Sequence, residues 1–504
     1  MANKLPLSKL FEAGPGAGKT HAMVDEIVSA IPILPPHRFL AAVTYTNAAA
    51  HTIRERLSRR VQPRGNVFIG TTHSFVNRFV LGPCAQLLSL LPGDRIYAAV
   101  DVSEKGRGAA IYTENLIRKG IVPYDAMVPL ARMILKRPEI HNRICERLAY
   151  IFVDEFQDVD IGMLEVFEQF RKAGKTALHV VGDPEQYVMS FSYRGQKAPA
   201  YDRIPFFRFQ RLAECKEIVE NHRSNEEIVT FVNQFRESLK QRAVKPKRNE
   251  SRILFIPATS LEDIVRRFQS VSATVETEKT QRTRLYLSEE NATFNPVCDQ
   301  FQLMSISNNR RENNTLLGDA LGLLSVALDR SQRRACEEFG MSRLQWRAEG
   351  VRLLRDFQVG QNSVDHLVAF VAKAFGYKVS KSRLKLIEDS LSIIREQFKG
   401  LESGWKSELY SSIRKAKGLE ADAVLVIAKT VAELKKWLQT ERSCRVADGQ
   451  DKCRLGYVAF TRPREMLCIA CLKEPDEELL QILQKLGVAV APGEVQEKQI
   501  QPEE

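Results

Sequence analysis

The feature that most constrains the fold is a glycine-rich segment near the N-terminus, Ala13-Gly14-Pro15-Gly16-Ala17-Gly18-Lys19-Thr20. It follows the apolar residues Leu10 and Phe11 and precedes a helical pattern over residues 20–30. Strand, loop and helix in this order are the context of a phosphate-binding loop. Glycines let backbone N–H groups converge on phosphate oxygens, and the helix start adds partial positive charge. A glycine-rich turn without a ligand is the alternative, which the flanking strand and helix disfavour.

A second strand pattern ends in two adjacent carboxylates. The apolar run Tyr150–Val153 leads directly into Asp154 and Glu155. Consecutive strand residues point to opposite faces, so one carboxylate can serve a metal ion and the other an attacking water. Such a pair alone is commonly a solvated loop, but after a phosphate loop it predicts NTP hydrolysis. We predict that Lys19 binds the phosphates of ATP, that Thr20 and Asp154 hold Mg²⁺, and that Glu155 polarises water.

Charge and composition favour a polyanionic partner. The chain has 504 residues, with 74 Lys and Arg against 62 Asp and Glu, and therefore a net charge of +12. This excess is typical of nucleic-acid-binding proteins, although other basic proteins carry it on a solvated surface. A hydrophobic content of 44% and a charged content of 27% are those of a globular protein and exclude wholesale disorder.

Two further sequence features bear on location. No uncharged apolar run reaches the ~18–20 residues of a membrane span, and the N-terminal segment lacks the apolar region of a secretory signal. The nine cysteines are thinly spread, as expected for reduced thiols. We therefore predict a cytoplasmic protein with no membrane partner.

The cysteines near the C-terminus allow a metal-site alternative. Cys444, Cys453, Cys468 and Cys471 include a C-x-x-C pair, which is one element of zinc and iron–sulfur sites. Strand alternation would point Cys468 and Cys471 to opposite faces. We therefore favour buried structural thiols.

The first third of the chain alternates short β-rich runs with helical patterns, which predicts a parallel sheet with crossover helices. The runs are Arg38–Thr44, Asn66–Thr72, Tyr150–Val153 and Thr176–Val181. Helical stretches run from Ser74 to about Glu146 and over 327–401, and the buried strands Ala423–Ala428 and Met466–Cys471 follow. The second stretch holds 14 basic and 9 acidic residues, which suits a duplex or partner contact but is more commonly a solvated helical face.

Further motifs follow the phosphate loop in a fixed order. They are Val43–Ala50 (VTYTNAAA), Gly70–Phe75 (GTTHSF), Asp154–Asp158 (DEFQD), Val181–Gln186 (VGDPEQ), Asn221–Ser224 (NHRS), Lys415–Glu420 (KAKGLE) and Arg454–Arg462 (RLGYVAFTR). In composition and order they resemble the motifs of superfamily 1 helicases of the UvrD/Rep type. Any one match can arise by chance, whereas the full ordered set cannot.

The resemblance implies an α/β fold with two RecA-like P-loop NTPase lobes, in which helices flank parallel sheets and helical insertions interrupt them. Nucleotide would bind between the lobes, at the carboxyl ends of the strands. The implied boundaries are 1–80 and 147–215 for the first lobe, 81–146 for its insertion, 216–326 and 402–491 for the second lobe, 327–401 for its reduced insertion, and 492–504 for a polar tail.

The resemblance also implies roles for individual residues. Arg223 and Arg462 would act as arginine fingers from the second lobe, and Gln186 would sense the γ-phosphate. His222, Gly418 and Glu420 would complete the nucleotide contacts. The implied contacts with single-stranded DNA are Tyr45, Thr46, Asn47, Thr72, His73, Phe191, Tyr193 and Arg194, the last three in a segment two residues longer than the family pattern. The alternatives are a helix-capping role for His73, core packing for the rings of Phe191 and Tyr193, and plain surface charge for the arginines.

Three positions depart from the family pattern. No glutamine precedes Ala13, where the family has one that reads adenine. The adenine-stacking tyrosine is His222, and the histidine that precedes the AKGLE motif is Arg414. These departures leave selectivity for ATP and the coupling between DNA and ATP open.

The compact layout resembles the helicase-like subunit of the Gabija antiphage system, which pairs with an OLD-family nuclease. The resemblance implies a DNA-dependent ATPase or helicase that moves 3′ to 5′ on single-stranded DNA, or senses DNA ends, and activates a nuclease partner in a hetero-oligomer. The alternatives are a DNA-end sensor without robust unwinding and a DNA repair helicase.

Overall fold

A computed structural model of the chain describes residues 8–62, 65–84, 97–98, 121–190, 200–236, 239–246, 252–273, 275, 282–305, 316–330, 332–358, 363–385, 387–388, 391 and 408–492. The chain forms two compact units. The α/β unit comprises Met1–Ile306 and Glu408–Glu504, and the helical unit comprises Ser307–Ser407.

The first sheet of the α/β unit has six strands in the order β3-β2-β6-β7-β1-β8, and all its pairings are parallel. The carboxyl ends of parallel strands meet at one edge of a sheet, so the segments that follow β1, β6 and β7 share that edge. The strands are β1 (Lys9–Ala13), β2 (Phe39–Thr44), β3 (Val67–Thr71), β6 (Leu148–Val153), β7 (Ala177–Gly182) and β8 (Glu214–Ile218).

Alternating side chains of this sheet pack into two cores, one on each face. In β6, Ile151 and Val153 join one core, while Tyr150 and Phe152 join the other, as period-2 geometry requires. Helices α1 (Lys19–Ala30) and α2 (Asn47–Ser58) cover the Tyr150 face. The other face is covered by α3 (Thr72–Val76), the π-helix Asn77–Leu81, α4 (Gly82–Cys84), α6 (Tyr124–Leu135), α7 (Pro138–Arg147), α8 (Ile161–Lys172) and α9 (Pro205–Gln210).

The second sheet has seven strands in the order β13-β14-β12-β15-β16-β11-β17, again with parallel pairings. Its central strand β15 (Ala421–Ala428) is buried along its whole length, as expected where helices cover both faces. The other strands are β11 (Ile253–Ile256), β12 (Arg284–Ser288), β13 (Met304–Ser305), β14 (Glu408–Ser412), β16 (Pro463–Cys471) and β17 (Ala489–Val490).

Helices also cover both faces of this second sheet. Helix α11 (Leu261–Ser272) packs on one core. The opposite core takes α10 (Glu226–Asn233), α17 (Val431–Trp437), α19 (Lys452–Phe460) and α20 (Glu477–Lys485). This unit also contains two short strand pairs, β9 (Glu220–Asn225) with β10 (Arg242–Lys245) and β4 (Tyr97–Ala98) with β5 (Ile121–Val122), and helix α18 (Arg442–Ala447).

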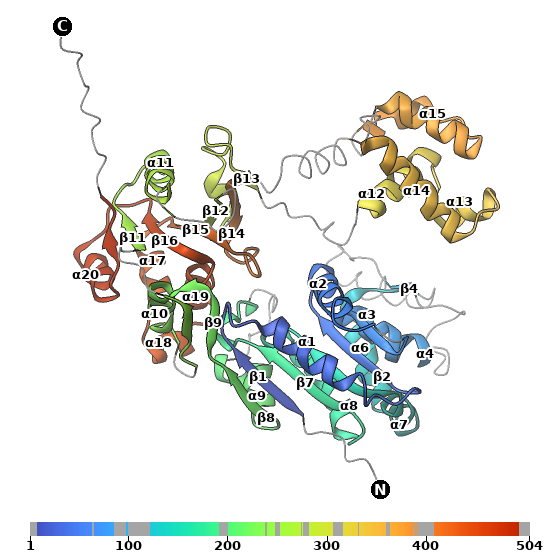
Figure 1. Cartoon of the computed structure of the whole chain (residues 1–504), viewed down its shortest axis with the longest axis horizontal. Coiled ribbons are helices and arrows are strands. Elements are labelled where there is room, and N and C mark those ends of the chain that lie inside the picture. The colour runs from blue at the N-terminus through green and yellow to red at the C-terminus, as the bar shows by residue number, and fades with distance from the viewer. Residues whose placement is uncertain are drawn as a thin grey trace, which may run out of the picture. The chain divides into compact units, whose positions relative to one another are not determined.

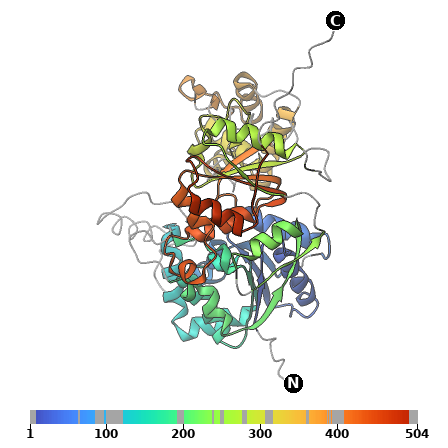
Figure 2. The ribbon, with the colours of Figure 1, turned by 90° about the vertical axis from the view of Figure 1, so that its left-hand side faces the viewer.

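Figure 1 labels most strands of both sheets, and Figure 2 shows the same ribbon turned by 90°. We refer to the body around the first sheet as lobe 1 and to that around the second, with β9, α10 and β10, as lobe 2. The prediction of an α/β fold with parallel sheets flanked by helices, as in RecA-like lobes, is confirmed.

The helical unit packs around one apolar core. It contains α12 (Leu316–Leu328), α13 (Gln332–Glu338), α14 (Arg343–Gln358) and α15 (Val364–Phe375). Trp346 of α14 is fully buried at the centre, where Phe375 packs against it with ring centroids 5.8 Å apart. Of all the helices that the structure describes, none is both long and apolar enough for a membrane crossing.

Gly456 offers a test of the packing in lobe 2. It lies in α19 against the end of α17, and a Cβ atom there would sit 2.5 Å from the backbone oxygen of Trp437. We expect Gly456→Ala to lower the free energy of unfolding by about 2 kcal/mol, because buried backbone must move to relieve the overlap. Urea denaturation measures this change.

The matched control is Gly449→Ala. No atom lies within 4 Å of the Cβ position there, so its effect should stay within about 0.5 kcal/mol. Equal stability of the Gly456→Ala variant and the native chain would contradict the packing described.

Candidate active site

The phosphate loop joins β1 to α1 in the conformation that its glycines make possible. Gly16 and Gly18 have φ angles of 74° and 76°, a left-handed backbone that side chains with a Cβ atom disfavour. Helix α1 has no acidic residue in its first turn. Its first N–H groups are therefore a site for anions, to which the helix dipole adds positive potential.

The two predicted carboxylates lie at the end of β6, close to the start of α1. Thr20 donates its hydroxyl hydrogen to Asp154, with an Oγ1–Oδ2 distance of 3.1 Å. The backbone of Glu155 is left-handed, with φ 51°, a conformation that surrounding contacts must hold in place. One such contact is the Gln157 amide, which donates to the Glu155 carboxylate at 2.6 Å.

The charged groups around Lys19 give the carboxyl groups of Asp154 and Glu155 different pKa values. Burial lowers the pKa of Lys19, while Glu155, Asp183 and Asp154 raise it. Burial and the charge of Glu155 raise the pKa of Asp154. Burial acts to raise the pKa of Glu155 too, but Lys19 and Lys417 outweigh it and hold that pKa below its usual range. Two adjacent carboxylates of different acidity are suited to different roles.

The oxygens of Thr20 and Asp154 fit a magnesium ion. Mg²⁺ in nucleotide sites takes one or two protein oxygens and completes its shell with phosphate oxygens and water. A hydroxyl and a carboxylate within 3.1 Å of each other supply such a pair. A divalent cation would also bring the raised pKa of Asp154 down. The residues present therefore suit the ion that the sequence predicts.

Lobe 2 contacts the phosphate loop through the NHRS motif. Asn221 donates its side-chain amide to the Pro15 carbonyl at 2.9 Å, and the backbone N–H of His222 donates to the Gly16 carbonyl at 3.0 Å. A Cβ atom at Gly16 would lie 2.6 Å from Asn221 Oδ1 and 2.7 Å from Arg223 Cβ. The glycine is thus needed for this contact as well as for the turn.

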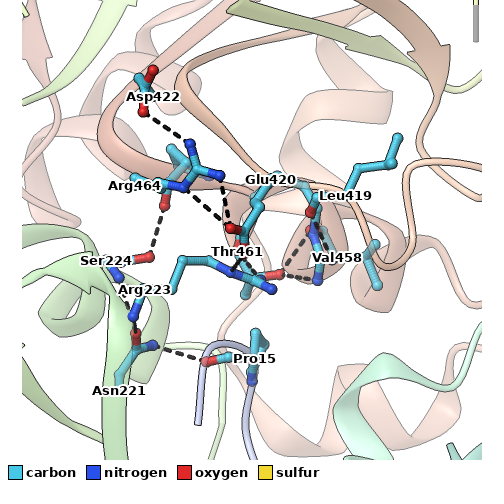
Figure 3. Close-up of polar contacts among 12 residues, drawn as sticks. Pro15, Asn221, Arg223, Ser224, Leu419, Glu420, Asp422, Val458, Thr461 and Arg464 are labelled. Carbon is cyan, nitrogen blue, oxygen red and sulfur yellow. Dashed lines mark hydrogen bonds and ion pairs between the residues drawn. The ribbon is translucent and has the colours of Figure 1, made fainter. Parts of the chain in front are cut away.

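Arg223 is the predicted finger nearest to the loop. Its Nε donates to Glu420 at 2.6 Å and its NH1 to the Thr461 carbonyl at 3.3 Å. Figure 3 shows this side chain between Asn221 and Glu420, with Arg464 on the far side of the same carboxylate. Burial acts to raise the pKa of Glu420, but Arg223 and Arg464 hold it down, at about 2. Glu420 therefore stays ionised and holds Arg223 in place.

Arg462, the second predicted finger, is fully buried. It donates to the Val458 carbonyl at 2.8 Å and to Gln186 Oε1 at 3.1 Å. Burial and the nearby charge of Arg223 lower its pKa to about 9, so it remains a cation at neutral pH. The structure thus brings the predicted sensor glutamine of lobe 1 to a predicted finger of lobe 2.

The KAKGLE motif reaches lobe 1 through Lys417. Its ammonium contacts Asp158 Oδ2 at 2.5 Å and donates to the Gln186 carbonyl at 3.2 Å. Gly418 follows with φ 87°, which turns the chain toward Glu420. Of the predicted nucleotide contacts, Glu420 binds Arg223, whose Cβ lies close to Gly16 of the phosphate loop.

His222 follows Asn221 in the same motif. Its backbone binds the loop, but 57% of its side chain is exposed, and the ring lies 3.6 Å from Glu220. Stacking of this ring on a base stays a prediction.

The predicted DNA-contact residues of lobe 1 follow β2 and β3. Tyr45, Thr46 and Asn47 are exposed, whereas Thr72 is buried. Thr46 caps α2 by accepting a bond from the Ala49 N–H at 3.1 Å. Phe191, Tyr193 and Arg194 lie outside the described residues.

His73 packs edge to face against Tyr124, with ring centroids 5.0 Å apart, and burial lowers its pKa. Tyr124 is 44% exposed and lies outside every motif recognised in the sequence. Tyr124 follows a proline at the start of a helix. Nothing in this local pattern indicates contact with a motif so far away in the chain.

The segment after the VGDPEQ motif is held by lobe 2. Arg445 pairs with Glu185 at 2.5 Å, and Arg414 donates to the Val188 carbonyl at 2.5 Å. Asp451 accepts a bond from the Ser190 N–H at 2.7 Å. Arg414, which departs from the family pattern, thus touches the segment that leads to the predicted stacking aromatics.

The C-x-x-C pair has its thiols on opposite faces of the second sheet. Cys468 lies in one core and Cys471 in the other. Within the described part of the chain, three or more His, Cys, Asp or Glu side chains nowhere gather as a metal-binding group.

Comparison with known proteins accords with this geometry. A family model described as an AAA domain matches residues 7–192. Gabija protein GajB of Bacillus cereus (strain VD045) is 30% identical over 205 residues, which cover 39% of this chain and 40% of that protein. The chain resembles superfamily 1 helicases of the UvrD/Rep type. This predicted resemblance is confirmed.

Two relatives from Escherichia coli (strain K12) belong to that type. The ATP-dependent DNA helicase Rep is 25% identical over 240 residues, or 37% of this chain and 35% of Rep. DNA helicase II is 24% identical over 277 residues, or 44% of this chain and 37% of the helicase. The matches thus span well under half the length of each relative.

Replacement of Glu155 tests the chemistry of this site. We expect Glu155→Gln to lower kcat for ATP hydrolysis about 100-fold or more, because an amide cannot accept the proton of the attacking water. Nucleotide affinity should change less than about threefold, because the phosphate loop is untouched. Steady-state hydrolysis and titration with a fluorescent ATP analogue measure the two quantities.

The control is Glu165→Gln on α8, whose carboxylate pairs with Arg132 at the surface. It should hydrolyse ATP at the native rate. A Glu155→Gln variant that kept most of its kcat would show that Glu155 is not the base.

Proposed function

We propose that this protein is a DNA-dependent ATPase of the UvrD/Rep type, which couples ATP hydrolysis to movement on single-stranded DNA or to sensing of DNA ends. One observation carries the proposal. Within one compact unit, lobe 1 supplies a phosphate loop and two carboxylates, and lobe 2 places two arginines beside them. A nucleotide there would touch both lobes, so its hydrolysis can change how they meet.

The residues divide the hydrolysis of ATP between them. The N–H groups of the loop and Lys19 bind the phosphates, and Glu155 accepts the proton of the water that attacks the γ-phosphorus. The bond to the β-phosphate oxygen breaks, and ADP and phosphate leave. Arg223 and Arg462 neutralise charge on the transferring group. Mg²⁺ held by Thr20 and Asp154 would neutralise further phosphate charge.

For Arg223 this role requires an exchange of partners. In the structure its guanidinium binds Glu420 and the Thr461 carbonyl. A γ-phosphoryl group offers a stronger competing anion, to which Arg223 would turn when ATP enters. Glu420 would then keep Arg464 as its partner, and we propose that its other oxygen contacts the sugar side of the nucleotide.

DNA would lie along the exposed ends of β2 and β3. Sequence-independent binding of single strands combines phosphate contacts with aromatic platforms. Tyr45, 40% exposed, and the paired rings of His73 and Tyr124 supply aromatic surface there. Thr46 and Asn47 supply polar contacts for phosphates. The family resemblance supports movement in the 3′-to-5′ direction.

One experiment tests the proposal. ATP hydrolysis by the native chain should rise at least about tenfold on addition of single-stranded DNA, a coupling typical of linked sites. Lys19→Ala should abolish hydrolysis with or without DNA. The same reactions on a duplex with a 3′ overhang report strand separation.

The outcomes separate the candidates. Strand separation with stimulated hydrolysis supports a helicase, whether in defence or in DNA repair. Stimulated hydrolysis without separation supports a DNA-end sensor. ATP turnover that is indifferent to DNA contradicts both.

Similarity to GajB favours a more specific candidate function. We propose that the chain is a Gabija-type defence subunit that activates an OLD-family nuclease in a hetero-oligomer. We expect an OLD-family nuclease encoded beside this chain to co-elute with it in size-exclusion chromatography and to cleave DNA faster when native chain and ATP are present. The Glu155→Gln variant should bind the nuclease without accelerating it. Nuclease rates unaffected by the native chain would contradict this role.

A further inference from the structure

A buried arginine of lobe 2 closes a ring of polar contacts with lobe 1. Arg236 follows α10, and its side chain has no exposed surface. Its NH1 donates to the Tyr457 hydroxyl at 3.0 Å, and that hydroxyl donates to Asp183 Oδ2 at 3.2 Å. Its NH2 lies 3.5 Å from Asp183 Oδ1. Asp183 belongs to the VGDPEQ motif of lobe 1, so the ring joins the lobes.

The same guanidinium reaches the base of the phosphate loop. Its NH2 lies 3.6 Å from Glu12 Oε1, on the residue that precedes Ala13. A Cβ atom at Gly14 would overlap Arg236 and the Gln241 amide, which donates to the Pro15 carbonyl at 3.1 Å. Arg236 therefore faces both the phosphate loop and the VGDPEQ motif.

The charges make this contact sensitive to how the lobes meet. Glu12 and Asp183 are 3% and 0% exposed and both come from lobe 1. The cation that faces them comes from lobe 2. If the lobes part, two carboxylates lose a buried counter-charge and must be hydrated instead.

Asp183 in turn orients the predicted sensor. Gln186 donates its amide nitrogen to Asp183 Oδ2 at 3.0 Å. A carboxylate only accepts hydrogen bonds, so the Gln186 oxygen must face the other way. There it accepts a bond from Arg462 at 3.1 Å. The sequence of contacts runs from Arg236 through Asp183 and Gln186 to Arg462.

We propose that Arg236 is a positioning residue that makes the orientation of Gln186 and Arg462 depend on the seating of lobe 2 on the phosphate loop. This inference rests on the proposed ATPase function and adds to it a residue outside the recognised motifs. With Arg236 in place, Asp183 is fixed and the sensor amide presents its oxygen to the finger. Without it, Asp183 loses its cation, and the amide and the finger lose their fixed geometry.

Three variants separate positioning from folding. Arg236→Met removes the charge, and Tyr457→Phe removes only the hydroxyl that bridges Arg236 and Asp183. Arg236→Lys retains the charge but cannot reach both partners at once. The control is Arg242→Met on β10, whose side chain is 75% exposed and pairs with Glu220 at the surface. Each variant is measured as the full chain, for melting temperature, kcat and KM for ATP, and affinities for ADP and a non-hydrolysable ATP analogue.

We expect Arg236→Met to lower kcat by about 10- to 100-fold, the usual effect of a misplaced catalytic group, with KM changed less than about threefold. The ratio of the affinity for the ATP analogue to the affinity for ADP should fall toward one, because the Gln186 sensor no longer detects the γ-phosphate. Tyr457→Phe should show the same changes to a smaller degree, Arg236→Lys should recover part of kcat, and Arg242→Met should match the native chain.

The inference is overturned if folded Tyr457→Phe and Arg236→Lys chains keep the native kcat and the native preference for the ATP analogue. It is also overturned if kcat in these variants falls only in step with the melting temperature. The native chain in the same assay distinguishes the two proposals. A native chain without ATP hydrolysis contradicts the proposed function, whereas native hydrolysis with unaffected variants contradicts the role of Arg236 alone.

Discussion

The rest of the site depends on one contact, the seating of lobe 2 on the carbonyl of Pro15. Asn221 and Gln241 both donate to this oxygen, at 2.9 and 3.1 Å. The contact is possible because the neighbouring residues, Gly14 and Gly16, have no Cβ atoms to hold the lobes apart. Arg223, two residues after Asn221, comes to the loop as a consequence. Backbone shape in the loop thus determines which cations of lobe 2 lie beside it.

Opposite charges that come from different lobes keep this contact specific. Asp158 faces Lys417, and Asp183 faces Arg236. Buried pairs of this kind add little to stability when compared with apolar packing, but they are costly to separate or to mismatch. These ion pairs therefore determine the relative orientation of the two lobes more than the strength of their association. Part of the basic excess of the chain serves this purpose.

Local patterns were sufficient to predict the strands and the loop, whereas pairing between lobes was not predictable from them. The run Tyr150–Val153 and the two carboxylates after it were recognised because strand, turn and acidic pair are adjacent in the chain. The ring of Arg236, Tyr457 and Asp183 joins three distant segments, and an arginine after a helix has no feature that indicates a buried partner. For His222, the motif predicts stacking of the ring on a base, and the structure adds a backbone contact with the phosphate loop that the motif does not indicate.

In the proposed function, one chain completes the nucleotide site by bringing its own two lobes together. Mixing two inactive variants, Lys19→Ala and Arg462→Ala, tests it most directly. Each variant lacks an essential residue of a different lobe. A site built within one chain is therefore inactive in every molecule of the mixture. The account predicts that an equimolar mixture with single-stranded DNA hydrolyses no more ATP than the two variants do separately. Recovery of hydrolysis on mixing would show that arginine and phosphate loop come from different chains, and would contradict it.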